Sequence, residues 1–530
     1  MSLQDLSFKQ RIETTDSFIV TCEHIPGRLS RGKKLDEIIE FATKGKETGL
    51  VHALSLTDNP GGTPALNPDF LAAEIEQAGL PVIVHMTTKD MNRNMIESRL
   101  LSLDRMGIKN VLVMSGDYQT LGQAGLPMPV FDIDPVHTLT MITMMNRGWR
   151  TDCFKRELEE CTPTEFYPGA VASPYKFTEP GMMLQLYKME KKARAGARYF
   201  VTQLGFDAGK LKDFMRYRAE IGIDIPVIGS VFILRKGAAA AMHRGDIPGS
   251  YVSETLLAEV QKESTAPDKG RAASLERAAM QVAVLMGLGF RGAHIEAMVL
   301  KFGMVETILG RAAELKDSWE ECAEKLAYAP DGAFYLGGKG HRAASPATRK
   351  LKRGWLTYRT MRALHALLFT KGAGLGRFMH GVSSLLDRVP LFGKTSHILE
   401  RVAKEVLFDC RDCGDCALPE LQYLCPQSQC PKQQRNGPCG GSRLDACEVY
   451  PERPCVWNRA YVRAKAFGEL DDLRRQIIGP RDWQLYNTSS WVNYHLDRDH
   501  AAYDFTGFFS APEKRPNDAA EPSSAGKQES

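Results

Sequence analysis

Eight short apolar runs, separated by helical segments, dominate the first 300 residues of this 530-residue chain. Each run is nearly continuously apolar, which is typical of strands that are buried on both faces of a parallel sheet. Eight alternating strand–helix units favour a (β/α)8 barrel, and an open doubly wound sheet is the alternative. The predicted strands are residues 18–23, 51–58, 81–88, 110–117, 169–174, 199–207, 225–234 and 291–296.

The rest of the chain has a different composition, and its length exceeds what one core usually supports. Residues 336–404 contain 14 Lys and Arg but only two acids, Asp387 and Glu400. A cysteine-rich stretch follows, and then a polar tail whose only apolar residues are alanine and proline. We therefore predict an α/β protein with four regions. These are a barrel over 10–325, a basic linker with short helices over 326–404, a small metal-binding module over 405–510, and a disordered tail over 511–530.

Eight of the twelve cysteines lie in the predicted module. The beginning of the chain carries no secretory signal, so we expect a cytoplasmic, reducing location in which metal ligation is favoured over disulfides. The module opens with C-x2-C-x2-C, as ferredoxin-like runs do, whereas C-x2-C pairs also build zinc ribbons. Iron–sulfur binding is the leading hypothesis and structural zinc the alternative. The predicted ligands are Cys410, Cys413, Cys416, Cys425, Cys430, Cys439, Cys447 and Cys455.

Polar residues occupy the C-terminal ends of the predicted strands, where (β/α)8 enzymes carry their chemistry. The set offers no serine nucleophile with a paired base and no convergent His or Cys ligands. It predicts binding of a polar planar heterocycle beside one proton donor, rather than hydrolysis or a metal site in the barrel. The residues are Glu23, Thr57, Asp58, His85, Asp117, Ser173, Gln203, Ser230, His294 and Glu296.

A basic segment precedes the sixth predicted strand. Lys188, Lys191 and Lys192 are spaced i, i+3 and i+4, so they share one face of a helix. Such a face can hold phosphate groups, and a solvated surface is the alternative.

Several motifs stand in a fixed order over residues 10–310, namely VTCE, LSLTD, VIVHMTT, VLVMSGD, RAGARYFVTQLGFD and MHRGDIPGSYVSETL. In order and spacing they resemble those of the methylenetetrahydrofolate reductase family. The resemblance implies a flavin-dependent barrel that reduces 5,10-methylenetetrahydrofolate to 5-methyltetrahydrofolate. It implies that Glu23 is the proton donor, that Asp117 lies near flavin and pterin as a second catalytic acid, and that Gln203 binds the folate substrate.

The same resemblance implies a flavin site for FAD or FMN. Its contacts would be Thr57, His85, Gly116, Asp117, Ser173 and Gln185, with Lys188, Lys191 and Lys192 along the phosphate arm. The cysteine module resembles the partner of some bacterial and acetogen-type reductases, which implies a [4Fe–4S] cluster and electrons from ferredoxin, with NAD(P)H as the other donor. We expect a homo-oligomer with no nucleic-acid or membrane partner. A folate or corrinoid methyltransferase and a zinc-stabilised interaction protein are the competing functions.

The proton-donor role requires a carboxyl that is neutral near pH 7. Burial should raise the pKa of Glu23 by desolvation. Asp117, by contrast, is expected to stay ionised by accepting hydrogen bonds from backbone N–H groups.

Overall fold

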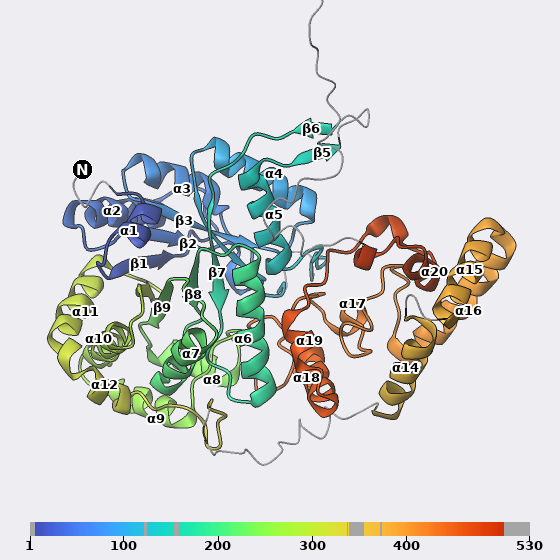
Figure 1. Ribbon diagram of the computed structural model, residues 1–530. Coiled ribbons are helices and arrows are strands. Elements are labelled where there is room, and N and C mark those ends of the chain that lie inside the picture. The colour runs from blue at the N-terminus through green and yellow to red at the C-terminus, as the bar shows by residue number, and fades with distance from the viewer. Residues whose placement is uncertain are drawn as a thin grey trace, which may run out of the picture.

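Eight parallel strands close into a barrel in the computed structural model, which describes residues 6–120, 125–152, 158–336, 338, 355–370 and 374–502 (Figure 1). The strand order around the barrel is β1-β10-β9-β8-β7-β4-β3-β2. Every barrel strand overlaps one predicted strand, so the predicted fold class is confirmed. The strands are β1 (Ile19–His24), β2 (Ala53–Leu56), β3 (Val82–Thr87), β4 (Asn110–Met114), β7 (Tyr167–Ala172), β8 (Tyr199–Thr202), β9 (Val227–Phe232) and β10 (Gly292–Glu296).

Helices surround the barrel, and one of them closes its N-terminal end. Phe8 of the short helix α1 is fully buried and packs edge-on against Tyr199 and Tyr167, with ring centroids 5.3 and 6.5 Å apart. The opposite end of the barrel, at the carboxyl ends of the strands, is therefore the end that remains open for a catalytic site. The helices are α1 (Phe8–Thr14), α2 (Lys33–Thr48), α3 (Pro68–Gln77), α4 (Arg93–Arg105), α5 (Pro135–Arg147), α6 (Glu179–Arg194), α7 (Ala208–Glu220), α8 (Lys236–Arg244), α9 (Glu254–Glu263), α10 (Arg271–Gly287), α11 (Phe302–Leu315) and α12 (Trp319–Lys325).

The region between barrel and module is more helical than the sequence predicted. Short helices were expected at 357–369 and 397–408, and the structure has α14 (Trp355–Leu368) and a longer α16 (Pro390–Phe408) there. Between them lies α15 (Gly374–Arg388), which the sequence analysis missed because its first turn is rich in glycine. Residues 339–354 of the predicted linker, residues 503–510 of the predicted module and the predicted tail at 511–530 lie outside the described residues. None of the helices that the structure describes is long and apolar enough to cross a bilayer.

The cysteine module packs directly against barrel helix α6 (Figure 1). Leu184 and Tyr187 of α6 share one apolar core with Trp457 and Tyr461 of α18. Helix α6 is thus covered by the barrel on one side and by the module on the other, which is why its lysines are buried. The module helices are α17 (Pro426–Gln429), α18 (Val456–Phe467), α19 (Leu470–Arg475) and α20 (Ser490–His495). A separate hairpin joins β5 (Arg150–Asp152) and β6 (Leu158–Glu160).

Candidate active site at the barrel mouth

A cavity of about 230 Å³ lies at the carboxyl ends of the strands. All ten strand-end residues singled out in the sequence line it, so their predicted convergence is confirmed. A larger hollow of about 800 Å³ lies at the opposite end, beside α1, away from this set of acids and imidazoles. The sequence did not predict that the C-terminal module also lines the mouth cavity, through Lys432, Pro438, Cys439, Gly440, Gly441 and Glu448.

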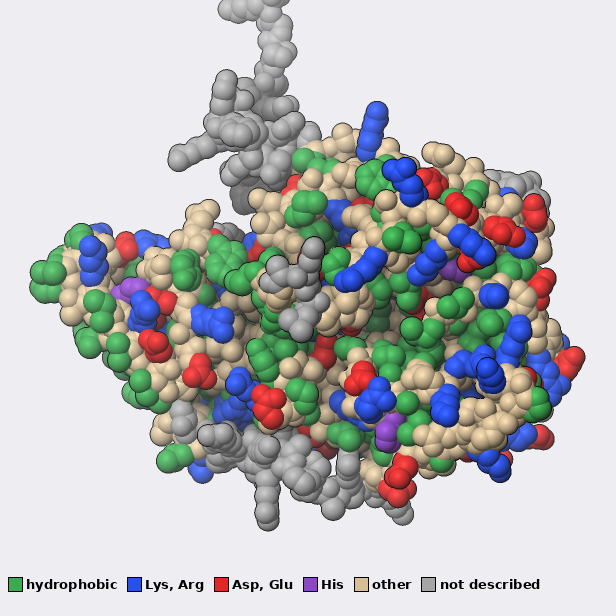
Figure 2. Space-filling model, turned by 180° about the vertical axis from the view of Figure 1, so that it is seen from behind, with side chains coloured by type: hydrophobic (Ala, Val, Ile, Leu, Met, Phe, Trp, Pro, Cys, Tyr) green, Lys and Arg blue, Asp and Glu red, His purple; other side chains and the backbone are tan. Residues whose placement is uncertain are grey.

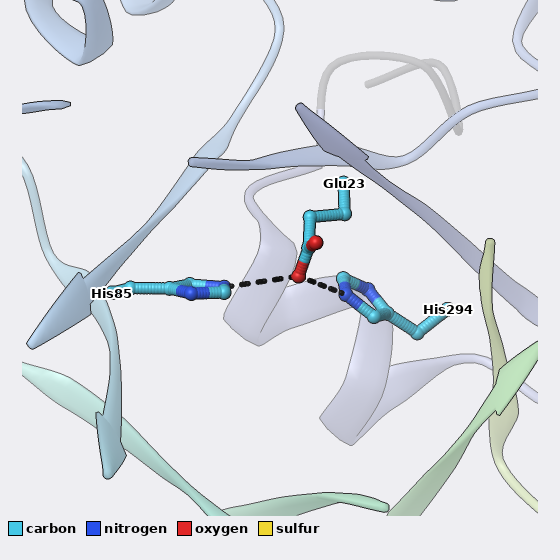
Figure 3. A group of neighbouring side chains, drawn as sticks. All are labelled: Glu23, His85 and His294. Atoms are coloured by element: carbon cyan, nitrogen blue, oxygen red, sulfur yellow. Dashed lines mark ion pairs between the residues drawn. The ribbon is translucent and has the colours of Figure 1, made fainter. Parts of the chain in front are cut away.

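Glu23, at the end of β1, points between two histidines (Figure 3). Its Oε2 lies 3.6 Å from Nε2 of His294 and 4.0 Å from Nε2 of His85. Burial, helped by the nearby charge of Asp117, raises the pKa of Glu23 to about 7. The predicted effect of desolvation is therefore present, and the carboxyl can carry a proton near neutral pH.

The two histidines are held in place by hydroxyl groups. His294 Nδ1 lies 2.7 Å from Thr21 Oγ1, and His85 Nε2 lies 2.7 Å from Ser55 Oγ. Burial lowers the pKa of both imidazoles, that of His85 to about 3, so both are neutral at pH 7.

Glu23, His85 and His294 place one ligand atom each within 4.8 Å of one another, a geometry that could hold a metal ion. The expectation that the mouth lacks convergent histidines was therefore wrong. The three residues come from β1, β3 and β10, and only closure of the barrel brings them together.

Two further carboxyls flank Glu23. Asp117 Oδ2 accepts a hydrogen bond from Gly61 N at 2.7 Å, as the sequence analysis expected. Burial raises the pKa of Asp117 above its ordinary value, and the charge of Lys432 and the hydrogen bond from Gly61 oppose that rise. Burial and then the charge of Glu23 raise the pKa of Glu296 to about 7. Glu23 and Glu296 disfavour each other's ionisation, so each carries a proton about half of the time near pH 7.

The remaining predicted residues have mixed environments. Thr57 Oγ1 is buried and has no hydrogen-bond partner among the described residues, so it is available to a ligand. Gln203 Oε1 accepts a hydrogen bond from Leu204 N at 2.9 Å, and Ser230 Oγ donates to Thr202 O at 2.7 Å. Asp58 is a structural residue instead, because it forms a 2.8 Å ion pair with buried Arg99.

A loop of the module, residues 432–442, enters the barrel mouth, and we call it the tongue. Lys188 Nζ donates to Gln434 Oε1 at 2.9 Å, to Pro438 O at 3.0 Å and to Gly437 O at 3.1 Å. Gln185 Nε2 donates to Cys439 O at 2.8 Å. Two predicted flavin contacts on α6 therefore bind the tongue.

The other buried lysines around the mouth are also engaged. Lys176 Nζ donates to the carbonyl oxygens of Gly440 and Ser442, and Lys192 Nζ donates to Val171 O at 2.6 Å. Lys191 is 2% exposed, with its Nζ 5.8 Å from the centre of the Trp457 ring. The three lysines of α6 therefore do not form the solvated surface that was the alternative for this helix, and Lys188 and Lys192 line the mouth cavity.

The tongue is also fixed to the end of β4 and shaped by glycine. Lys432 Nζ donates to Gly116 O at 2.8 Å and pairs with Glu448 at 2.5 Å. A Cβ atom on Gly441 would lie 1.7 Å from Glu448 Oε2, so a side chain there would displace this ion pair. The Gly440–Gly441 pair between cysteines was the sequence signal that could have revealed a close backbone approach.

We predict that Lys188→Met loosens the tongue. Because three buried acceptors would lose their donor, the free energy of unfolding should fall by about 2–4 kcal/mol. Urea denaturation would measure the change, and protease cleavage within 432–442 should become faster. Lys212→Met, at an exposed position of α7, is the matched control and should be nearly neutral. Equal free energies of unfolding for the two variants would contradict the hydrogen bonds described between Lys188 and the tongue.

The eight predicted thiols fall into two sets. Cys410, Cys413, Cys416 and Cys425 surround a cavity of about 30 Å³. In the second set, burial raises the pKa of Cys430 to about 12, and the neighbouring thiols Cys439 and Cys447 add to the shift. The pKa of Cys455 is raised by burial and by the charges of the same three thiols, Cys430, Cys439 and Cys447.

The spacing of the thiols bears on what they could bind. A tetrahedral zinc site with bonds of about 2.3 Å places its sulfur atoms roughly 3.8 Å apart. In the described part of the chain, which includes both thiol sets, no three sulfur atoms lie within 4.8 Å of one another. As they lie in the structure, the thiols of neither set form a closed tetrahedral site.

The fold and the cavity define a (β/α)8-barrel enzyme with a protonatable carboxyl at its mouth and a thiol-rich cap. Residues 7–311 match the family model described as methylenetetrahydrofolate reductase, and residues 389–484 match one described as methylene-tetrahydrofolate reductase C terminal. The chain therefore belongs to the methylenetetrahydrofolate reductase family, a family of oxidoreductases.

Individual relatives are distant. A probable methylenetetrahydrofolate reductase (NADPH) of Caenorhabditis elegans is 24% identical over 216 residues, which are 39% of this chain and 29% of that protein. An uncharacterised protein from Clostridium thermocellum that binds two copies of 5-methyl-5,6,7,8-tetrahydrofolic acid has 16% identity and a TM-score of 0.39, covering 58% of this chain and 99% of its own. The EDTA monooxygenase of Chelativorans sp. BNC1 has 13% identity and a TM-score of 0.37, and the match covers 57% of this chain and 93% of that chain.

The family is flavin-dependent, and the residues of this chain fit a flavin only in part. Thr57, His85, Gly116 and Asp117 line the cavity, and the unpaired Thr57 hydroxyl suits a ring edge. Ser173, Gln185, Lys188 and Lys192 line it too, but Gln185 and Lys188 already bind the tongue and Lys192 already donates to Val171 O. A phosphate arm along α6 would require these side chains to exchange their present partners.

Proposed function

We propose that this chain reduces 5,10-methylenetetrahydrofolate to 5-methyltetrahydrofolate, with Glu23 as the general acid. The observation that carries the proposal is the Glu23 carboxyl, whose pKa of about 7 leaves it half protonated at neutral pH in a cavity lined by neutral imidazoles. Protonation of N10 opens the five-membered ring of the substrate to an iminium ion. Two electrons and one further proton then convert the iminium carbon into the methyl group.

The other mouth residues would position the folate. Asp117 follows β4 and Gln203 follows β8, both line the cavity, and both can hydrogen-bond to the donor and acceptor edge of a pterin. The carboxyl of Glu296, beside His294 at 3.8 Å, is placed to return a proton to Glu23 through the imidazole. An assay for 5-methyltetrahydrofolate with purified protein and a low-potential dye tests the activity directly.

For electron delivery we propose the cysteine module, with iron–sulfur clusters favoured over zinc by its ferredoxin-like opening, C-x2-C-x2-C. FAD or FMN would require the tongue to leave α6. NAD(P)H donates a hydride and would need such a flavin, so a one-electron carrier of the ferredoxin type is the proposed donor. A homo-oligomer in the cytoplasm remains part of the proposal, and the basic surface at 355–404 could attract an acidic carrier.

The Glu23–His85–His294 group favours one competing function. A zinc ion held there would suit a folate or corrinoid methyltransferase, the alternative that the sequence analysis had disfavoured for want of histidines. Metal analysis of a variant without module cysteines separates the two functions, because zinc bound to the barrel would persist in it.

We predict that folate reduction falls as pH rises through about 7, because only the protonated form of Glu23 is active and its protonated fraction falls above that pKa. Asp117 contributes to the raised pKa, so Asp117→Asn should move the midpoint of the decline to lower pH, besides weakening folate binding. The pH profile of kcat/KM measures both effects. A profile that is flat between pH 6 and pH 8, a range of about one unit on each side of the pKa, would contradict the assignment.

A further inference from the structure

We infer that a cleft beside the barrel mouth binds the aminobenzoyl-glutamate tail of the folate, and that Arg443, the residue after the tongue, holds one of the tail's carboxylates. This inference rests on the proposed function, and it gives the C-terminal module a part in substrate recognition. The cleft has a volume of about 320 Å³ and lies between the loop after α8, residues 245–251, and the end of the tongue. The lining residues used below are Tyr175, Lys176, Phe177, Arg244, Tyr251 and Arg443.

The cleft adjoins the mouth cavity. Ile247, Pro248, Gly441 and Glu448 line both spaces. The mouth cavity alone, at about 230 Å³, is smaller than the roughly 300–1,000 Å³ of pockets that enclose a ligand of drug size. A folate whose pterin lies beside Glu23 therefore needs further space for its tail, and the cleft offers that space.

The chain carries no side chain where the two spaces meet. Gly249 lines the cleft, and a Cβ atom there would lie 2.5 Å from Nε2 of Gln203, which lines the mouth cavity. The same atom would lie 3.4 Å from Gly440 O of the tongue. The φ of Gly249 is +78°, a conformation that favours glycine. A side chain here would narrow the way from the proposed pterin contact Gln203 into the cleft.

The walls of the cleft suit an aromatic ring followed by polar groups. The rings of Phe177 and Tyr251 lie side by side, with their centroids 4.8 Å apart, and offer an apolar surface to the benzoyl ring. The hydroxyl of Tyr175 is buried and has no hydrogen-bond partner among the described residues, so it is available to a ligand.

Cations outnumber acids in the cleft. Lys176, Arg244 and Arg443 line it with a single acid, Glu448, which is already paired with Lys432. Arg443 has no carboxylate partner in the part of the chain that the structure describes. On the face of the molecule in Figure 2, by contrast, basic and acidic side chains are interspersed. The local excess of cations predicts that the ligand brings an anionic group.

Arg443 is held in position before a ligand arrives. Its Nη2 donates to His243 O at 2.6 Å, and its guanidinium carbon lies 5.1 Å from the centre of the Tyr251 ring. A guanidinium has five N–H donors in a planar fork, so those that remain can bind a carboxylate through two hydrogen bonds. Arg244 is less suited to this role, because it is exposed and forms a 2.6 Å ion pair with Asp246.

The test uses the purified full-length protein and two ligands. One is 5-methyltetrahydrofolate, and the other is the methylamide of 5-methyltetrahydropteroic acid, which keeps the benzoyl ring but lacks both glutamate carboxylates. Equilibrium dialysis gives the dissociation constants of both for the wild type, Arg443→Gln and Arg105→Gln. The glutamine at 443 keeps an amide that can donate to His243 O, and Arg105→Gln makes the same change at an exposed position of α4.

The wild type and Arg105→Gln should bind 5-methyltetrahydrofolate about 10–100-fold more tightly than the methylamide, which is the usual worth of hydrogen bonds to a charged group. Arg443→Gln should bind both ligands with similar, weak affinity, since the residue and the carboxylate form one interaction. In steady-state reduction of 5,10-methylenetetrahydrofolate, the same variant should show a higher KM at nearly unchanged kcat.

Equal binding of the two ligands by the wild type, or a wild-type preference that persists in Arg443→Gln, would overturn the inference. If Arg443→Gln fails to fold, Arg443→Lys takes its place. Lysine keeps the charge but not the fork, so it should keep only part of the preference, and an undiminished preference would count against the inference. Folate reduction without any preference for the tail would leave the proposed function standing and remove only the inference. A preference that depends on Arg443, without folate reduction by any donor, would do the reverse.

Discussion

Glu23→Gln should reduce folate turnover by about 10²–10⁴-fold, which is the usual contribution of a general acid. Glutamine has nearly the shape of glutamate but cannot donate a proton to N10, so the substrate ring would stay closed. The hydroxyl contacts that hold His85 and His294 do not involve Glu23 and should remain. Steady-state production of 5-methyltetrahydrofolate measures the loss.

The matched control is Glu13→Gln, which makes the same chemical change at an exposed position of α1. It should leave turnover within twofold of the wild type. Iron content and dye oxidation without folate should be the same in both variants. Full turnover in Glu23→Gln would remove Glu23 from the mechanism, whereas loss of iron would mean that the substitution had disturbed the mouth as a whole.

Cys413→Ser should abolish folate reduction by reduced ferredoxin while leaving reduction by a small viologen dye nearly intact. Cys413 belongs to the thiol set whose cavity also includes Lys404 and Arg481, in the outer part of the module. A protein carrier would need this set to pass electrons inward, but a small dye can reach the mouth itself. Initial rates with the two donors give the comparison.

Cys161→Ser is the control, because this half-buried cysteine lies in the barrel region and outside both sets. It should keep full activity with either donor. Unchanged ferredoxin-driven turnover in Cys413→Ser would show that the first set is not on the electron path. Full activity of wild type with NADH, together with zinc and no iron, would assign the module a structural role.

The barrel could be predicted from sequence because its signals are local. Each buried strand is an apolar run of a few residues, and each strand end contributes its polar residue at a fixed place, so Glu23 and His294 could be assigned to one mouth without knowing any distance. The approach of the His294 imidazole to the Glu23 carboxylate required closure of the barrel between β1 and β10, which no local sequence pattern predicts.

The role of α6 could not be predicted for a related reason. The spacing of Lys188, Lys191 and Lys192 correctly placed them on one helix, but the partners of Lys188 lie about 250 residues later in the chain. A lysine that faces phosphate and one that faces carbonyl oxygens have the same sequence pattern. Only the contact between α6 and the tongue distinguishes them, and that contact depends on packing of the whole module.

The tongue also sets an order of events during synthesis. The last barrel strand ends at Glu296, whereas the tongue begins at Lys432, so the barrel leaves the ribosome well before the segment that completes its mouth. At about 5–20 residues per second, the completed barrel waits roughly 7–30 s for the tongue. During that interval the barrel exposes cations and apolar surface that the finished protein hides. A chain released before the tongue is made should therefore be a client of chaperones rather than a smaller working enzyme.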